Sequence, residues 1–274
     1  ASAYFKIEQD WIFEIGLTPN RSDAMSHIGV ARDLAAALEI IYHKPYPIKK
    51  PDLSHFKIDN TLLPIQVEVT DSKACPRYAG ITLTNVKVSD SPDWLKNYLL
   101  AVGLRPINNI VDITNFVLQE TGQPLHAFDA DKISGKKVIV KKLTEGAKFV
   151  TLDEVERSLQ ANDLMICNET EGMCMAGVFG GTKSGITENT HNIFIESAYF
   201  DPVHVRKTSK YHGLKTDASF RFERGVDPDG VVFALKRAAL LIKENAGGSI
   251  SSEIMDVYPT PIKGFLVFLC CALF

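Results

Sequence analysis

Residues 105–129 read RPINNIVDITNFVLQETGQPLHAFD, and this stretch combines helical spacing with polar side chains that a plain core helix does not need. Val111, Asn115 and Leu118 recur at the spacing of one helix face, so the sequence predicts a short helix with an amide on a largely apolar side. Gly122 is a natural end for this helix, and Pro124 prevents its continuation. Because buried polar groups need partners, we expect this helix to form one wall of a pocket.

His126 is the second notable feature of this stretch. It comes after the predicted helix end, so we expect it on a turn from which the imidazole could face Thr114 and Asn115. A histidine after a helix end is often a simple capping donor, and the sequence leaves both interpretations open.

The composition limits the function classes. A chain of 274 residues with 45% hydrophobic residues can bury a substantial core, in one large domain or two ordinary ones. A net charge of −3 argues against a protein that holds nucleic acid by bulk electrostatics, so any RNA contact should be local. The five cysteines form no CxxC pair, which favours free thiols in a reducing cytoplasm over disulfides, and no export signal opens the chain.

The N-terminal part of the chain reads as a small unit of its own. Residues 1–16 alternate in YFKIEQ and WIFEIG, which predicts short strands. A helix is expected from about Ser22 to about Tyr42, and its apolar stripe is typical of a core helix. Residues 43–64 hold four prolines without periodicity, which indicates a linker with a boundary near residue 50.

The remaining pattern is a series of short strands with a few helices. Strands are expected at 65–70 and 77–88, within 136–181, and at 192–200, with polar turns typical of antiparallel neighbours. Helices are expected at about 91–103, 201–213 and 227–248, with a loop-like stretch at 211–228. The predicted fold class is therefore α+β, with antiparallel or mixed sheets and packed helices.

Glu196 stands out because IFIESAYF places a carboxylate among aromatic side chains. Its simplest interpretation is an edge-strand carboxylate paired with a nearby arginine, such as Arg206 or Arg221. A binding role in a pocket is the alternative.

Histidine and aspartate side chains of the chain are of the types that bind metal ions. The candidate ligands are scattered along the chain without short ligand spacing, and the prediction is that there is no metal site. These candidates are His126, Asp129, His204 and His212.

Five ordered segments carry a resemblance to a known family. They are LTPNRSDAMSHIGVARDLAA, RPINNIVDITNFVLQETGQPLHAFD, MAGVFGG, IFIESAYF and TDASFRFERGVDP. In this order they resemble the β subunit of bacterial phenylalanyl-tRNA synthetase, over about residues 1–260.

The resemblance implies a domain organisation. Residues 1–50 correspond to the C-terminal part of the subunit's N-terminal domain plus a linker, and residues 51–260 to its editing domain, with the fold of that domain. Residues 261–274, which include the apolar run GFLVFLCCALF, are expected to be the start of a following domain or non-native residues. This run is too short to span a membrane.

The resemblance also implies an activity, which is hydrolysis of tyrosine wrongly joined to the phenylalanine tRNA. Phenylalanine and tyrosine differ by one hydroxyl, which a hydrophobic pocket rejects by only about a hundredfold, so a second site is useful. By motif, Glu196 would bind the tyrosine hydroxyl. The other implied site residues are, on the ester side, Thr114, Asn115 and His126, and, around the substrate, Gly177, Thr216 and Ala218.

At the level of the parent enzyme, the resemblance implies a cytoplasmic heterotetramer of two α and two β chains that uses ATP and Mg²⁺ outside this chain. Editing itself would need no cofactor. The expected partners are the mischarged phenylalanine tRNA and the α subunit, without a membrane. Two alternatives remain open, a non-catalytic module for structure or tRNA docking and a free-standing hydrolase of other aminoacyl esters.

Overall fold

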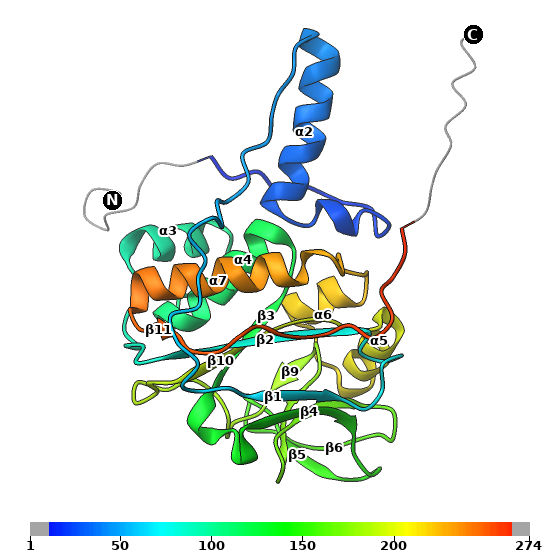
Figure 1. Ribbon diagram of the computed structural model, residues 1–274. Helices are drawn as coiled ribbons and strands as arrows, with labels where there is room; N and C mark the ends of the chain where they lie inside the picture. Colours follow the sequence, from blue (N-terminus) through cyan, green and yellow to red (C-terminus); the bar gives the residue numbers. More distant parts are fainter. Residues whose placement is uncertain (1–10, 265–274) are drawn as a thin grey trace, which may run out of the picture.

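The computed structural model describes residues 11–264, and most of them form a main body of three layers (Figure 1). A layer of helices covers one face of a first sheet, and a second sheet covers the other face. The first sheet, here called the central sheet, has the strand order β11-β2-β10-β3, and β12 also pairs with β2. The second, the outer sheet, has the order β1-β4-β7-β8-β9. This arrangement confirms the α+β class.

The sheets are mixed, as expected. Strand β1 pairs with β4 in parallel, and the other described pairings are antiparallel. The strands of the central sheet are β2 (Arg77–Thr84), β3 (Leu125–Asp129), β10 (Ile193–Tyr199), β11 (Ser249–Ile250) and β12 (Met255–Val257). Those of the outer sheet are β1 (Gln66–Val69), β4 (Lys137–Lys142), β7 (Leu164–Cys167), β8 (Gly172–Met175) and β9 (Phe179–Gly180), and a separate hairpin joins β5 (Lys148–Val150) and β6 (Glu156–Ser158).

Three helices form the layer above the central sheet (Figure 1), namely α3 (Asp93–Ala101), α4 (Asn109–Thr121) and α7 (Gly230–Ala246). Helix α4 is the predicted helix of the 105–129 stretch. The Asn108 side chain caps it by accepting from two backbone N–H groups, and Gly122 ends it with a φ of 83°. The remaining helices of the body are α5 (Pro202–His212) and α6 (Asp217–Phe222), with the 3-10 turns η2 (Ala130–Lys132) and η3 (Ser134–Lys136).

Strand alternation divides the core in two. Ile193 and Ile195 of β10 face the helices, while Phe194 faces the outer sheet together with Phe128. Each such fully buried apolar side chain contributes about 1.5–3 kcal/mol to folding. Glu196 follows Phe194 by two residues, so its side chain points to the same face of the strand. The fold therefore places this carboxylate between the two sheets.

The N-terminal helix differs from its prediction. Helix α2 (His27–Tyr42) has the expected end, but it projects away from the body, and Gly29 is its one buried residue (Figure 1). Leu34 and Ile41 are exposed. The prediction of a core helix was wrong, because no second layer within residues 11–264 covers its apolar stripe.

Other N-terminal predictions are settled only in part. A 3-10 turn, η1 (Ser22–Ala24), precedes α2, and residues 11–16 form no strand, so the strand predicted for WIFEIG was wrong. The strand predicted for YFKIEQ and the last ten residues of the tail lie outside the described residues. The proline-rich stretch at 43–64 contains neither helix nor strand, as predicted.

Within the described range, no helix combines the length and apolar character that a membrane crossing requires.

Candidate functional site

Glu196 and His126 lie directly opposite each other on neighbouring strands. In the antiparallel pair of β10 and β3, Glu196 is in register with His126, and across β2 it is in register with Gly80. Residues in register on antiparallel strands carry their side chains on the same face of the sheet. The carboxyl and the imidazole therefore both project from the central sheet toward the outer sheet.

His126 is part of strand β3, which corrects the prediction of a turn. Gly122 ends α4 as expected, but the chain then enters the central sheet within a few residues, because Leu125 and Ala127 pack among the apolar residues under the helices. The imidazole leaves the opposite face, where it makes an edge contact with Phe128 at 4.5 Å between ring centroids.

Glu196 is buried and has one direct partner. The residue is 5% exposed, and the Tyr78 hydroxyl donates to its Oε2 at 2.7 Å. Within residues 11–264 no hydrogen bond reaches Oε1. Burial raises the pKa of Glu196 to about 8, against the smaller opposing effect of the Tyr78 hydrogen bond. At neutral pH the group is therefore largely a neutral carboxylic acid with one oxygen free for a ligand.

The expected arginine partner of Glu196 is absent from the described contacts. Arg221 forms its ion pair with Asp217 instead, and Arg206 has no ion pair among residues 11–264. The interpretation of Glu196 as an edge-strand carboxylate in a salt bridge was wrong on both points, because β10 lies inside the sheet between β2 and β3. A carboxyl buried there without a cation stays protonated.

His126 is neutral at physiological pH. The residue is half-buried between the sheets, and burial of its ring lowers the pKa of the imidazole to about 4. A methyl group built at Gly180 of β9 would lie 3.2 Å from the ring, so this glycine leaves room for the imidazole. A neutral imidazole can accept a proton from water or hold a water molecule by a hydrogen bond.

Thr114 and Asn115 lie on α4, in the helix layer. The Thr114 hydroxyl donates to the carbonyl of Val111 at 2.7 Å, and Asn115 is half-buried. No hydrogen bond among the described residues connects either side chain with His126. The imidazole projects from the other face of the central sheet, so the direct contact expected from the sequence is not formed.

Gly177, Thr216 and Ala218 form a second group beside the outer sheet. Thr216 donates from its hydroxyl to the carbonyl of Val178 at 3.0 Å, which ties the start of α6 to the residue after Gly177. Ala218 packs against the same apolar cluster as Phe222. Thr216 caps α6 and Ala218 lies within it, so the loop predicted across 211–228 was wrong for Asp217–Phe222.

Position 177 requires a glycine for two reasons, its backbone conformation and the closeness of neighbouring side chains. Its φ is 69°, and an added methyl group would lie 2.9 Å from the rings of Phe200 and Phe222. The position of Gly177 is therefore fixed by packing. Cys174, three residues earlier, is buried close enough to Glu196 for the carboxyl to help raise the pKa of the thiol, after burial itself. Cys174 therefore lies near both the second group and the carboxyl.

Two further residues that shape this site were not predicted from the sequence. Tyr78 lies in the strand predicted at 77–88, and only the pairing of β2 with β10 reveals it as the partner of Glu196. Gln123 is buried, and its amide nitrogen donates to the carbonyl of Ala198 at 2.8 Å. Its Oε1 has no partner among the described residues. In the sequence, the only indication of a role for Gln123 is that a polar residue follows directly after Gly122, where the helix ends.

The candidate metal ligands lie in separate interactions. His204 pairs with Asp201, and His212 pairs with Asp163, each at 2.7 Å. Residues 11–264 contain no group of three or more His, Cys, Asp or Glu side chains arranged to hold a metal ion. The cysteines described there are Cys75, Cys167 and Cys174, all free and buried, in agreement with the predicted free thiols.

Comparison with known proteins assigns most of the body to one family. Residues 74–247 match the B3/4 domain family. The chain is 58% identical over 269 residues to the phenylalanine–tRNA ligase β subunit of Bacteroides thetaiotaomicron, a match that covers 98% of this chain and 33% of that protein. It is 47% identical over 260 residues to the same subunit of Geobacter metallireducens, covering 93% of this chain and 31% of that protein. The chain thus spans about a third of these curated relatives.

Among solved structures, the chain resembles an N-terminal fragment of the phenylalanyl-tRNA synthetase β subunit from Pyrococcus horikoshii. The TM-score is 0.48 at 16% identity, with 93% of this chain and 71% of that chain covered. The family match covers more than half of the chain, and the curated relatives carry the name of the family that the sequence motifs resemble. The chain is therefore a member of the B3/4 domain family, and its resemblance to the β subunit of phenylalanyl-tRNA synthetase is confirmed.

Proposed function

We propose that this chain is the editing module of a phenylalanyl-tRNA synthetase β subunit and hydrolyses tyrosine esters of the phenylalanine tRNA. The observation that supports this most is the buried Glu196, whose Oε1 is free while Tyr78 occupies Oε2. A tyrosine phenol can both donate and accept a hydrogen bond, so it can pair with a neutral carboxyl group. A phenylalanine ring would leave the carboxyl oxygen unpaired, at a cost of about 1–3 kcal/mol.

The hydrolytic step needs little beyond a positioned water, because an aminoacyl ester is already activated. Water attacks the ester carbonyl, the new C–O bond forms, the bond to the ribose oxygen breaks, and a proton passes from the water to that leaving oxygen. His126, neutral and in register with Glu196, is suited to orient the water or accept its proton. In this proposal the ester lies beside His126 and its ribose extends toward Thr114 and Asn115 in the helix layer, while Gly177, Thr216 and Ala218 enclose the aromatic ring.

The parent enzyme forms part of the same proposal. We expect it to be a cytoplasmic heterotetramer with an α subunit that forms phenylalanyl-tRNA with ATP and Mg²⁺ outside this chain. Editing in this chain would use no cofactor.

The first test compares hydrolysis of tyrosyl-tRNA and phenylalanyl-tRNA. We expect a preference for the tyrosyl ester of about 5- to 150-fold, which corresponds to 1–3 kcal/mol. Glu196→Ala should reduce that preference toward one, and Glu188→Ala, at an exposed carboxylate, should leave it unchanged. Equal rates on both esters in the unmodified protein would refute the specificity. Binding of the RNA without hydrolysis of either ester would favour the alternative of a non-catalytic docking module.

A further inference from the structure

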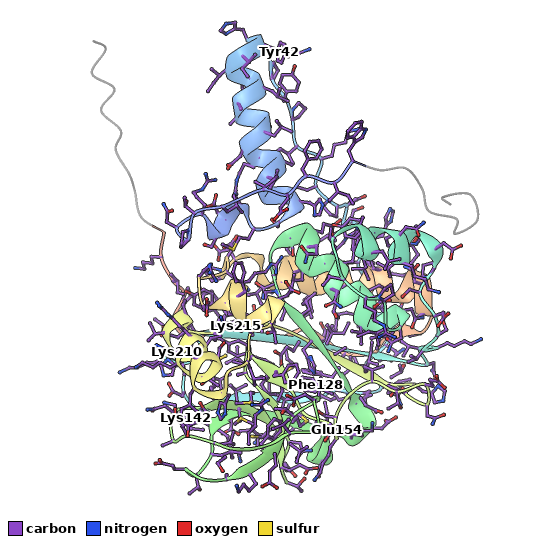
Figure 2. The ribbon with its side chains drawn as sticks, turned by 180° about the vertical axis from the view of Figure 1, so that it is seen from behind. Tyr42, Phe128, Lys142, Glu154, Lys210 and Lys215 are labelled. Atoms are coloured by element: carbon purple, nitrogen blue, oxygen red, sulfur yellow. The ribbon has the colours of Figure 1, made fainter. Side chains whose placement is uncertain are left out.

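The outward face of α5 carries a concentration of positive charge. Arg206, Lys207 and Lys210 are all exposed, and none has an ion pair among the described residues. Lys215, also exposed, follows five residues after Lys210 on the segment that leads to α6, and Figure 2 shows both lysines at the same edge of the molecule. The chain as a whole has a net charge of −3, so this local excess of lysine and arginine is not a general property of its surface.

The carboxylates near this helix do not neutralise it. Asp201 caps the first turn and pairs with His204. Asp163 is buried and is engaged by His212, by the Thr208 hydroxyl at 2.7 Å and by a backbone N–H. A basic residue in the last turn, such as Lys210, also complements the helix dipole, but Arg206 and Lys207 lie farther from that end.

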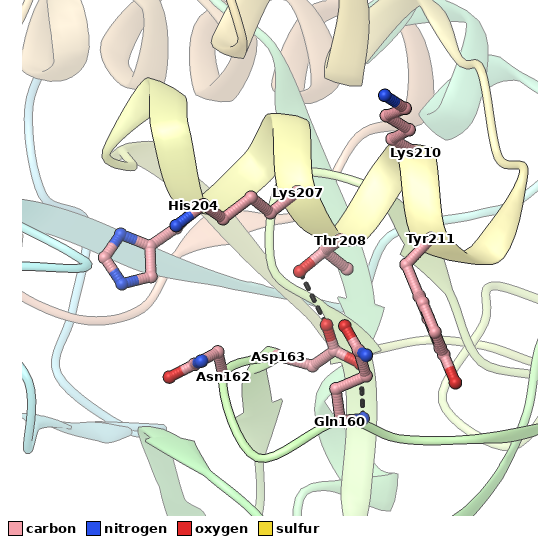
Figure 3. Close-up of a pocket in the computed structure, with 8 residues that line it drawn as sticks. All are labelled: Gln160, Asn162, Asp163, His204, Lys207, Thr208, Lys210 and Tyr211. Carbon is pink, nitrogen blue, oxygen red and sulfur yellow. Dashed lines mark hydrogen bonds between the residues drawn. The ribbon is translucent and has the colours of Figure 1, made fainter.

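A hollow of about 400 Å³ lies beside this charged face (Figure 3). Lys207, Lys210 and Tyr211 line it from α5, and the amide side chains of Gln160 and Asn162 line it from the segment before β7. Tyr211 is 58% exposed. Exposed aromatic rings stack on unpaired bases, lysines bind the phosphates between them, and amides can bind base edges.

The charged face adjoins the candidate site through α5 and through the chain that follows it. Val205, on the buried side of α5, lies 3.2 Å from a methyl group built at Gly177. Lys215 immediately precedes Thr216, whose hydroxyl binds Val178. A ligand held on the outward face can thus reach the site by passing round the C-terminal end of α5, over about the width of one helix, 10–12 Å.

We propose that the outward face of α5, with Lys207, Lys210, Tyr211 and the adjoining hollow, binds the single-stranded 3′ end of the RNA that carries the aminoacyl ester. This inference rests on the proposed function, since it supplies the RNA contact of the same substrate. The occupant is a single strand because the hollow offers one ring for stacking and amides for unpaired base edges. A duplex would present phosphates but no free bases.

The test measures binding of the complete protein to a short 5′-labelled single-stranded RNA ending in CCA, by fluorescence anisotropy at several salt concentrations. The double variant Lys207→Ala/Lys210→Ala should bind about tenfold more weakly at low salt, and the slope of log affinity against log salt should fall by about 1.4, or 0.7 for each lost phosphate contact. Tyr211→Ala should weaken binding with little change in slope. The matched control, Lys57→Ala/Lys87→Ala, removes two exposed lysines elsewhere.

Hydrolysis separates this inference from the proposed function. The double variant should lose kcat/KM on tyrosyl-tRNA by about the same factor as binding, and should hydrolyse tyrosine methyl ester, which lacks RNA, at the unmodified rate. Binding and slope equal to those of the control variant would overturn the RNA surface, whatever the hydrolytic activity. Reduced RNA binding in a protein that hydrolyses neither ester would support the RNA surface and refute the proposed function.

Discussion

At the scale of single residues, the chemistry of this site depends on burial more than on charge. Glu196 and His126 project from the same face of the central sheet, and burial favours the neutral form of each. A neutral carboxyl group and a neutral imidazole suit a ligand that brings a phenol and an ester, neither of which carries a charge. The bond from Tyr78 leaves the carboxyl one open position, which is the basis for discrimination.

The raised pKa of Glu196 predicts a pH dependence of stability. The group has a pKa of about 8 in the folded chain against an ordinary value of 4.5, so the folded state binds more protons, and stability falls as pH rises through this interval. The shifted pKa of His126 has the opposite effect on stability. Because this pKa is lowered in the folded chain, stability falls as pH decreases from 6.5 toward 4. Between pH 6.5 and 8, Glu196 is therefore the one of these two residues that changes the stability with pH.

We therefore expect the unmodified chain to lose about 2 kcal/mol of unfolding free energy between pH 6.5 and 8, at about 1.4 kcal/mol per pH unit. Glu196→Gln should remove most of this loss, and Glu188→Gln, at an exposed position, should retain it. Urea denaturation at both pH values provides the measurement. An unchanged loss in Glu196→Gln would show that Glu196 is already ionised at neutral pH.

At the scale of elements, α6 shows how a short helix can hold a site in place. The Thr216 hydroxyl accepts from the Ser219 backbone N–H, and the Ser219 hydroxyl accepts from the Thr216 backbone N–H, which completes a capping box. The same Thr216 hydroxyl donates to Val178. One side chain thus begins the helix and attaches it to the segment of Gly177, although the six residues of α6 have little helical stability of their own.

Removing this hydroxyl should destabilise the chain. Thr216→Ala is expected to lower the free energy of unfolding by about 1–2 kcal/mol, because both the cap and the tie to Val178 are lost. Thr216→Ser keeps the hydroxyl and should cost much less. Chemical denaturation compares the two variants, and equal stability of the alanine and serine variants would contradict a structural role for this hydroxyl.

At the scale of the whole molecule, the central sheet separates two cores, and Glu196 and His126 project from the same face of it. Helix α2 stands outside this body (Figure 1), and Arg221 of α6 is one of the residues that join the two parts. Its guanidinium donates to the side chain of Gln119 at 3.0 Å and to the carbonyl of Met25 at 3.4 Å. Arg221 is 9% exposed, and burial lowers its pKa from the ordinary value.

Loss of Arg221 should loosen the N-terminal segment without unfolding the body. We expect Arg221→Ala to increase amide hydrogen exchange within residues 21–42, while exchange in the central sheet changes little. Arg224→Ala is the control, since Arg224 interacts with Glu223 and Phe220 of its own segment. Unchanged exchange in Arg221→Ala would mean that other contacts hold α2.

The sequence by itself determined the α+β class, the family, helix α4 with its end at Gly122, and the position of Glu196 on a strand. These features depend on local periodicity, turn residues and ordered motifs, which a single chain displays directly. It did not reveal the free-standing α2, the helix α6 or the strand position of His126. Those depended on contacts with segments far away in the chain.

Only the tertiary structure decided what surrounds the carboxyl. The register of β3 against β10 brings His126 opposite Glu196, and the pairing of β2 with β10 brings the Tyr78 hydroxyl to its Oε2, from 118 residues away. Strand pairing has this effect because a shift of one residue would turn every side chain to the other face of the sheet. The sequence supplied the carboxyl, and the register of the central sheet buried it, left it uncharged and gave it its partners.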